Sequence, residues 1–267
     1  MSVNNPVEVI KRVLTIGENK VALNSNDIPR SILLSILAGI YIAMGSALAL
    51  MVGNGFTEVV AGNPIVKSLL GGMVFPIGLI LVVMLGAELF TGNNALLIPS
   101  LGEKRYSFGK VLKNWGIVYV GNFIGAIFFA YVFIYLAEIS AKEPYHQAAM
   151  DIAVAKTSLP WMVAFIRGVA ANWFVCLAVW LALSCNSAGA KMFGCWLPVF
   201  TFVTFGFEHS IANMFFIPLG IFEGAAVTWG DFAIKNLIPV TLGNIVGGAI
   251  FVGLTYYYIN KKGISRD

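Results

Sequence analysis

The stretch Gly206-Phe-Glu-His-Ser-Ile-Ala-Asn213 interrupts an otherwise apolar run that extends from 193 to 218. A related stretch, Glu88-Leu-Phe-Thr-Gly-Asn93, interrupts the apolar run from 68 to 99, and each stretch is followed by Ile-Pro. The two glutamates lie 120 residues apart. Polar breaks inside long apolar runs are typical of helices that are interrupted within a membrane.

The composition places these runs in a membrane protein. Of the 267 residues, 58% are hydrophobic and 11% are charged, and the mean hydropathy is +0.83. Soluble domains carry about 25% charged residues, so disorder is excluded and a soluble domain is not expected. At about 20 residues per helix, the apolar runs predict six transmembrane spans. These lie near 31–53, 68–99, 111–136, 160–184, 193–218 and 236–259.

A second motif supports an internal repeat. Lys-Asn, followed after six residues by Gly-Asn and then by a further Gly, occurs at 113–125 and again at 235–247. The offset of 122 agrees with the 120 between the glutamates, so each unit contains three spans, about 31–136 and 160–259. A unit with an odd number of spans inserts its second copy upside down, as in transporters and channels. The spaced glycines predict close helix packing.

Basic residues predict the orientation. The side that holds the two ends of the chain and loops 100–112 and 185–192 carries 12 of the 17 Lys and Arg residues, including Lys113 beside the first loop, whereas the other side carries 4. This bias places both termini in the cytoplasm, with the protein spanning the inner (cytoplasmic) membrane several times. The net charge of +4 is therefore a topology signal and implies no nucleic-acid partner. The three cysteines, Cys176, Cys185 and Cys195, are expected to be packing residues.

The predicted organisation is a cytoplasmic N-terminal segment (1–30), a six-helix channel domain (31–260) and a cytoplasmic tail (261–267). We expect no short cleavable signal before the first span, because residues 1–30 are polar and mixed in charge. Residues 6–23 carry apolar side chains at helical spacing with charges between them. This pattern predicts an amphipathic helix that lies either in the membrane interface or as a lid over the pore.

The breaks favour an anion. If each begins a half-helix, its free N–H groups and the positive end of its dipole face the middle of the membrane. Thr91 and His209 lie in the two breaks. A threonine offers a hydroxyl donor, and a histidine offers a donor or a proton near neutral pH. The structural alternatives are a threonine bonded back to its own helix and a satisfied packing histidine.

Acids and amides accompany both breaks. Glu88 and Glu208 occupy equivalent positions, so we expect each carboxylate to accept freed N–H groups and fix its half-helix, rather than to form a catalytic pair. Asn93 and Asn213 are expected to support the breaks in a similar way. Asn172 is a polar group in span four that requires a partner, either in a pore, where it would orient the histidine, or between helices.

At these residues the sequence resembles the formate/nitrite transporter family. The resemblance covers most of the chain, and its second and third stretches are the most specific. The matching stretches are Gly86-Ala-Glu-Leu-Phe-Thr-Gly-Asn93, Asn172-Trp-Phe-Val-Cys-Leu-Ala-Val-Trp180, Gly206-Phe-Glu-His-Ser-Ile-Ala-Asn-Met-Phe-Phe-Ile-Pro218 and Lys235-Asn-Leu-Ile-Pro-Val-Thr-Leu-Gly-Asn-Ile-Val-Gly-Gly248.

The resemblance implies an all-α, aquaporin-like fold of six transmembrane helices, arranged as two inverted three-helix repeats with broken second and fifth helices. It implies a homopentamer in which each protomer has its own pore. The central pore residues would be Thr91 and His209, with Lys156 at the entrance and Asn172 in contact with the histidine. The implied hydrophobic constrictions are Phe75 and Phe202 on the outer side and Leu79, Leu89 and Phe90 toward the cytoplasm.

The substrates implied by the resemblance are small monovalent anions such as formate, nitrite, hydrosulfide, acetate and lactate, which cross the lipid bilayer. No cofactor and no metal are expected. We expect the anion to be attracted by Lys156, to accept a proton near His209 and to cross the apolar constrictions as the neutral acid. The competing expectation is that the ion crosses charged, with helix ends replacing its hydration.

Two other classes remain as alternatives. An aquaporin-like channel for neutral solutes favours Asn-Pro-Ala at both breaks, whereas this chain has Asn93-Asn-Ala95 and Asn213-Met-Phe215. An intramembrane enzyme would require a catalytic pair. Ser210 beside His209 does not form one, because neighbouring side chains on a helix point apart.

Overall fold

The computed structural model describes residues 3–264, which are helical apart from loops and one isolated β-bridge between Val3 and Cys185. Residues 265–267 of the expected tail lie outside the described residues. The elements are α1 (Pro6–Asn26), α2 (Ile28–Asn54), α3 (Thr57–Gly62), α4 (Ile65–Val74), α5 (Ile77–Leu85), α6 (Phe90–Leu96), α7 (Ile98–Gly102), α8 (Phe108–Phe128), η1 (Phe129–Tyr135), α9 (Tyr145–Thr157), α10 (Trp161–Ser184), α11 (Ala188–Thr204), α12 (Ser210–Phe222), α13 (Trp229–Asp231), η2 (Phe232–Leu237), α14 (Ile238–Gly248), η3 (Ala249–Leu254) and α15 (Thr255–Ile264), where η marks π-helical segments.

The six predicted spans are present, and the fifth is divided. Five helical segments are long and apolar enough to cross a membrane: Ile28–Asn54, Ile65–Leu85, Phe108–Tyr135, Trp161–Ser184 and Trp229–Ile264. The other span consists of the shorter helices α11 and α12, which are separated by the predicted break. The fold is therefore that of an all-α membrane protein, as the sequence predicts.

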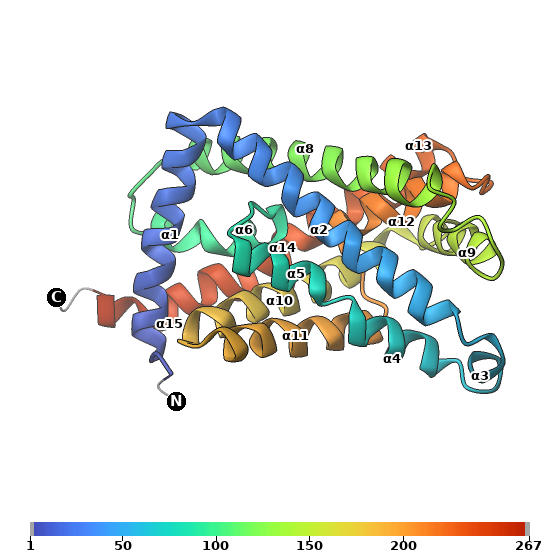
Figure 1. Cartoon of the computed structure of the whole chain (residues 1–267). Helices are drawn as coiled ribbons and strands as arrows, with labels where there is room; N and C mark the ends of the chain where they lie inside the picture. The colour runs from blue at the N-terminus through green and yellow to red at the C-terminus, as the bar shows by residue number, and fades with distance from the viewer. Residues whose placement is uncertain (1–2, 265–267) are drawn as a thin grey trace.

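The two ends of the bundle differ. Helices α1 and α15 lie at one end, and α3, α9 and α13 lie at the other (Figure 1). We call these the terminal side and the α9 side. The long helices run between the two ends, and the short helices α6 and α12 lie within the bundle. This arrangement places the two half-helices where the repeats meet.

Close glycine contacts join the spans of each repeat. A Cβ at Gly125 in α8 would meet the carbonyl oxygen of Ile36 in α2, and a Cβ at Gly247 in α14 would meet that of Val169 in α10. The same contact thus occurs in both repeats, between the third and first span of each. This confirms the predicted glycine packing, in which the missing side chain lets two backbones approach each other.

Each break begins at a glycine in the left-handed backbone region. Gly86 has φ +73° and Gly206 has φ +70°, which a residue with a Cβ rarely adopts. After each glycine, the chain runs through an extended residue, Leu89 or His209, into the next helix. Because the glycines lie 120 residues apart, the two breaks are built in the same way and confirm the interrupted second and fifth helices.

The second span also has a bend that the sequence reading did not include. Helix α4 ends at Val74 and α5 begins at Ile77, with Pro76 between them. Proline lacks the N–H that would continue the helical ladder, which accounts for this bend.

Helix α1 is amphipathic, as predicted, but its apolar face does not lie in the membrane interface. Val9, Ile10 and Val13 are buried in a cluster with side chains of α6, α10 and η3. The interfacial alternative is wrong for this face, because protein covers it. The helix instead lies across the terminal-side end of the bundle (Figure 1).

Candidate functional site

The two breaks meet inside the bundle. Thr91 Oγ1, in the first turn of α6, lies 3.0 Å from Nε2 of His209, which directly precedes α12. Thr91 is fully buried and His209 is only 3% exposed. The two side chains come from opposite repeats, 118 positions apart in the chain. The structure therefore brings together the two polar residues that the sequence placed at the centre.

His209 also caps α12. Its Nδ1 accepts a hydrogen bond from the backbone N–H of Ala212 at 3.1 Å. A neutral imidazole whose Nδ1 accepts carries its proton on Nε2, so Nε2 donates to the Thr91 hydroxyl oxygen. The Thr91 hydroxyl proton is then available to a second acceptor. Leu89, the equivalent residue of the first break, offers no such side-chain cap.

Two asparagines fix the breaks. Asn122 Oδ1 accepts from the backbone N–H of Phe90 at 2.9 Å, and Asn244 Oδ1 accepts from that of Ser210 at 2.9 Å. The amide nitrogen of each asparagine donates to the carbonyl of the break glutamate and to a carbonyl of the first span of its repeat. Each amide thus satisfies two backbone groups that the break leaves without helical partners, and its third bond ties the break to the first span of the repeat.

The break glutamates make different contacts from those expected. The prediction that Glu88 and Glu208 accept freed N–H groups is wrong, because asparagine side-chain oxygens accept the N–H groups of Phe90 and Ser210. The Glu88 carboxylate accepts instead from Asn93 at 2.8 Å, and that of Glu208 accepts from Asn213 at 2.7 Å. The carboxylates thus fix the half-helices through side chains one turn further on.

Each carboxylate also pairs with a lysine. Lys156 Nζ, at the end of α9, lies 2.9 Å from Glu208 Oε1, and Lys20 Nζ of α1 lies 2.6 Å from Glu88 Oε1. Both pairs are largely buried. Because a buried carboxylate is costly without a partner, each lysine stabilises its break by balancing the charge of the glutamate.

Asn172 is central but holds a different group from the one expected. Its amide nitrogen donates to the carbonyl of Thr91 at 3.1 Å, to that of Asn244 at 2.6 Å and to Asn94 Oδ1 at 3.2 Å. Among residues 3–264, no hydrogen bond joins it to His209. The asparagine therefore positions the backbone of Thr91, rather than the imidazole.

A cavity of about 240 Å³ opens on the α9 side of the contact between Thr91 and His209. Its lining includes Lys156, His209, Phe75 and Phe202. The rings of Phe75 and Phe202 pack edge to face with centroids 5.9 Å apart, and Phe202 stacks on the His209 ring at 6.0 Å. The two phenylalanines therefore form an apolar wall beside the imidazole.

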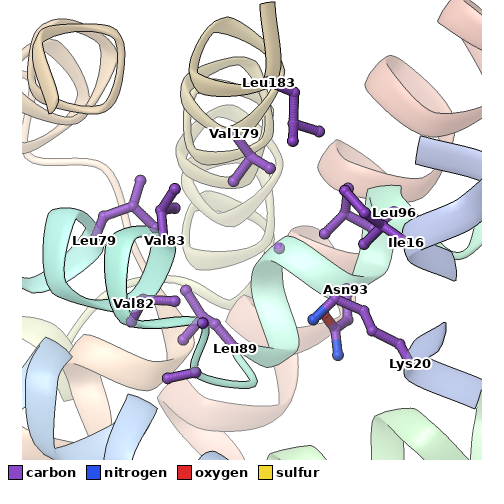
Figure 2. A pocket seen from close by; sticks show the side chains of 13 residues that line it. Ile16, Lys20, Leu79, Val82, Val83, Leu89, Asn93, Leu96, Val179 and Leu183 are labelled. Carbon is purple, nitrogen blue, oxygen red and sulfur yellow. The ribbon is translucent and has the colours of Figure 1, made fainter. Parts of the chain in front are cut away.

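A second cavity, of about 210 Å³, opens on the terminal side. Figure 2 shows Lys20 and Asn93 near each other in its lining, with Leu79 and Leu89 further away. Phe90, predicted as a constriction, does not join them. It packs against Trp115 and Tyr119 and lines a separate pocket between α8 and α14.

Sequence reasoning missed Lys20 and four asparagines. The asparagines are the Asn of the Lys-Asn and Gly-Asn motifs in both repeats, so their signal was present but was used only to identify the repeat. Asn114 and Asn236 each accept a hydrogen bond from the asparagine amide that holds the break glutamate, Asn93 and Asn213 respectively. Among residues 3–264, no group of three or more His, Cys, Asp or Glu side chains could hold a metal ion.

Comparison with known proteins agrees with this geometry. Residues 7–258 match the family model described as formate/nitrite transporter. The chain is 44% identical to a probable formate transporter of Methanothermobacter thermautotrophicus, covering 98% of each protein. It is 36% identical to the formate channel FocA of Haemophilus influenzae, covering 92% of each.

Solved structures give the same result. One described as an FNT family ion channel aligns with a TM-score of 0.86 and 31% identity, covering 94% of this chain and 98% of the other. A pentameric formate channel with formate bound aligns with a TM-score of 0.76 and 36% identity, covering 89% of this chain and 98% of the other. With two inverted breaks that meet at a threonine and a histidine, and with these relatives along nearly its whole length, the chain belongs to the formate/nitrite transporter family, whose members are channels and transporters rather than enzymes.

Proposed function

We propose that this protein conducts small monovalent anions of weak acids, with formate as the first candidate and nitrite and hydrosulfide as further candidates. The observation that carries this proposal is the buried contact between Thr91 and His209, which lies between two mostly apolar cavities that each contain a lysine. The formate transporters and channels among its relatives support the choice of formate.

The donors at the centre favour anions over cations. Lys156 and Lys20 lie on the two sides of the central contact, where Glu208 and Glu88 balance their positive charges. The α12 N-terminus lies at the contact, with its dipole positive toward it. Among the described residues, the backbone N–H of Ile211 has no hydrogen-bond partner. A small anion near His209 therefore meets donors and positive potential.

The apolar walls favour passage of the neutral acid. Moving a bare carboxylate into a low-dielectric region costs about 20 kcal/mol in the idealised case, and several kcal/mol after relaxation. Protonating a carboxylate with a pKa of about 3.7 at neutral pH costs about 4.5 kcal/mol. We infer that Lys156 attracts the anion, that the anion gains a proton near His209, and that the neutral acid passes Leu79 and Leu89.

His209 can supply that proton only as an imidazolium. Its transfer to an anion oxygen breaks one N–H bond and leaves a neutral ring, which regains a proton from hydronium that reaches it from the bulk solution. Because Nδ1 accepts from Ala212 in the neutral state, charging the ring sacrifices this cap, at a cost of about 1 kcal/mol. The relay thus couples each proton to a change at the α12 N-terminus.

The surroundings of the channel are part of the proposal. Residues 31–260 form the channel domain in the lipid bilayer of the cell's inner membrane, with segments 1–30 and 261–267 on its cytoplasmic side. The basic residues at the terminal side support this orientation. The likeness to a pentameric channel supports a homopentamer in which each protomer has its own pore.

The test is a flux panel with purified protein in proteoliposomes. We expect saturable uptake of formate, and of nitrite or hydrosulfide, that rises as the external pH falls because His209 then receives protons for the relay more readily. Chloride, whose conjugate acid is strong, should not be taken up measurably. Uptake of water or glycerol without anion uptake would contradict the proposal.

A further inference from the structure

Helix α9 runs beside α12 and is held to it at both ends. At one end Lys156 pairs with Glu208, just before α12. At the other end His146 Nδ1 lies 2.9 Å from Oε2 of Glu223, the residue that directly follows α12. Between these points the two helices pack closely. A Cβ at Gly220 would lie only 2.4 Å from the Cβ of Ala153, which is closer than van der Waals contact allows. The contact between His146 and Glu223, which we call the outer anchor, therefore helps to hold α9, the helix that carries Lys156.

The outer anchor contains a buried acid and a histidine that water can reach. The Glu223 side chain is 6% exposed, whereas that of His146 is 35% exposed. Ser140, which is fully buried, donates its hydroxyl proton to the other carboxylate oxygen of Glu223. A buried carboxylate depends strongly on its partner's charge, and an imidazole is charged only when protonated.

We propose that His146 is a positioning residue: through Glu223 it anchors α9 in a pH-dependent way and so sets the position of Lys156 at the pore mouth. This rests on the proposed function of Lys156 in attracting the anion. When His146 is protonated, an ion pair holds the start of α9 on α12. When it is neutral, only a hydrogen bond remains, and α9 is held less firmly.

The other ionisable groups on neighbouring elements make no hydrogen bond to His146 among the described residues. In the preceding loop and α9, these groups are Glu138, Lys142, Glu143 and Asp151. Asp151 accepts from Gln147, and Glu143 accepts from the Gln147 backbone N–H. On the neighbouring α13 and η2, Asp231 pairs with Lys235 at 2.6 Å. Among the described residues, Glu223 is thus the acidic group bonded to His146.

The first test needs no transport. Hydrogen exchange over 145–157 is compared at about pH 5.5 and about pH 8, on either side of the ordinary histidine range, after correction for intrinsic exchange. We expect about threefold faster exchange at the higher pH, as for a partly exposed ion pair. His146→Gln should exchange equally at both pH values. Gln147→Ala is the control on the same helix, since its hydrogen bonds join it to Asp151 and Glu143 and not to α12, and it should behave as the wild type.

The second test uses formate uptake by cells that express the protein. At about pH 5.5 His146→Gln should raise the apparent KM about threefold with unchanged maximal rate, and at about pH 8 it should match the wild type. Glu223→Gln, which removes the buried charge, should likewise lose the pH dependence of exchange. If exchange in the wild type does not change with pH, the anchor proposal is wrong, whatever is transported. If exchange responds but no anion is transported, the anchor stands and the proposed function fails.

Discussion

Single amides carry the structure of each break. Asn244 bonds the N–H of Ser210 and the carbonyls of Gly168 and Glu208, and none of these three groups can reach water. Removing a buried hydrogen-bond partner costs more than the bond itself, because the remaining group stays desolvated. The stability of the second half-helix should therefore depend on this side chain.

We expect Asn244→Ala to lower the free energy of unfolding by about 2–4 kcal/mol, because it orphans two buried backbone groups of the break, the N–H of Ser210 and the carbonyl of Glu208. Thermal unfolding in detergent measures this change. Asn260→Ala is the matched control, since its amide bonds only its own helix at Tyr256 and should shift stability by about 0.5 kcal/mol or less. Equal shifts in the two variants would contradict the assigned role of Asn244.

The two functions of His209 can be separated by substitution. His209→Asn keeps an oxygen that can cap α12 but removes the titrating proton, whereas His209→Phe removes both. We expect both variants to lose the steep pH dependence of formate uptake, and only His209→Phe to lose about 1 kcal/mol of stability. An unchanged pH profile in His209→Asn would remove the proposed relay and leave the histidine as a cap.

At the level of residues, the sequence predicted the central pair but not its surroundings. Thr91 and His209 stand out because polar groups in an apolar run need a partner. The destination of each amide could not be predicted, because it depends on which backbone groups the break leaves unpaired. Lys20 was missed because a lysine in a polar, amphipathic segment looks like an exposed charge.

At the level of elements, α1 and α9 are counterparts. Each supplies the lysine that pairs with a break glutamate, and each also meets an asparagine of the Lys-Asn motif. Asn114 bonds the Asn24 side chain of α1, and Asn236 bonds the Lys156 carbonyl of α9. The sequence did not predict this correspondence. Both helices lie outside the repeated units, and they share a lysine but no longer motif.

The glycine contacts yield a prediction for these elements. A side chain at Gly243 would run into the carbonyl of Phe165, so Gly243→Val should separate α14 from α10 and abolish the folded state. Gly116→Val is the control in a transmembrane helix, since a Cβ there meets nothing within 4 Å. The yield of monodisperse protein in size-exclusion chromatography distinguishes them. Comparable yields would show that this backbone contact is dispensable.

At the level of the whole molecule, the symmetry of the scaffold stops at the centre. Leu89 occupies the position equivalent to His209, and Ile211 occupies the position equivalent to Thr91. The repeat builds two similar breaks, while these departures leave one polar contact between two apolar walls. An internal offset in the sequence predicted the inverted scaffold, but only the packed structure shows that Phe90 faces α8 rather than the path of the anion.

This asymmetry leads to a prediction about membrane potential. A single polar contact offers the substrate one place to exchange a proton, so we expect the neutral acid to cross the remaining apolar path. At equal pH on both sides, formate accumulation in proteoliposomes should then be the same with and without a potassium diffusion potential of about 100 mV. A charged ion would gain or lose about 2.3 kcal/mol over that potential, equivalent to about a 50-fold change in its distribution. Accumulation that follows the potential would show that formate crosses as an anion, with Thr91, His209 and the helix ends replacing its hydration.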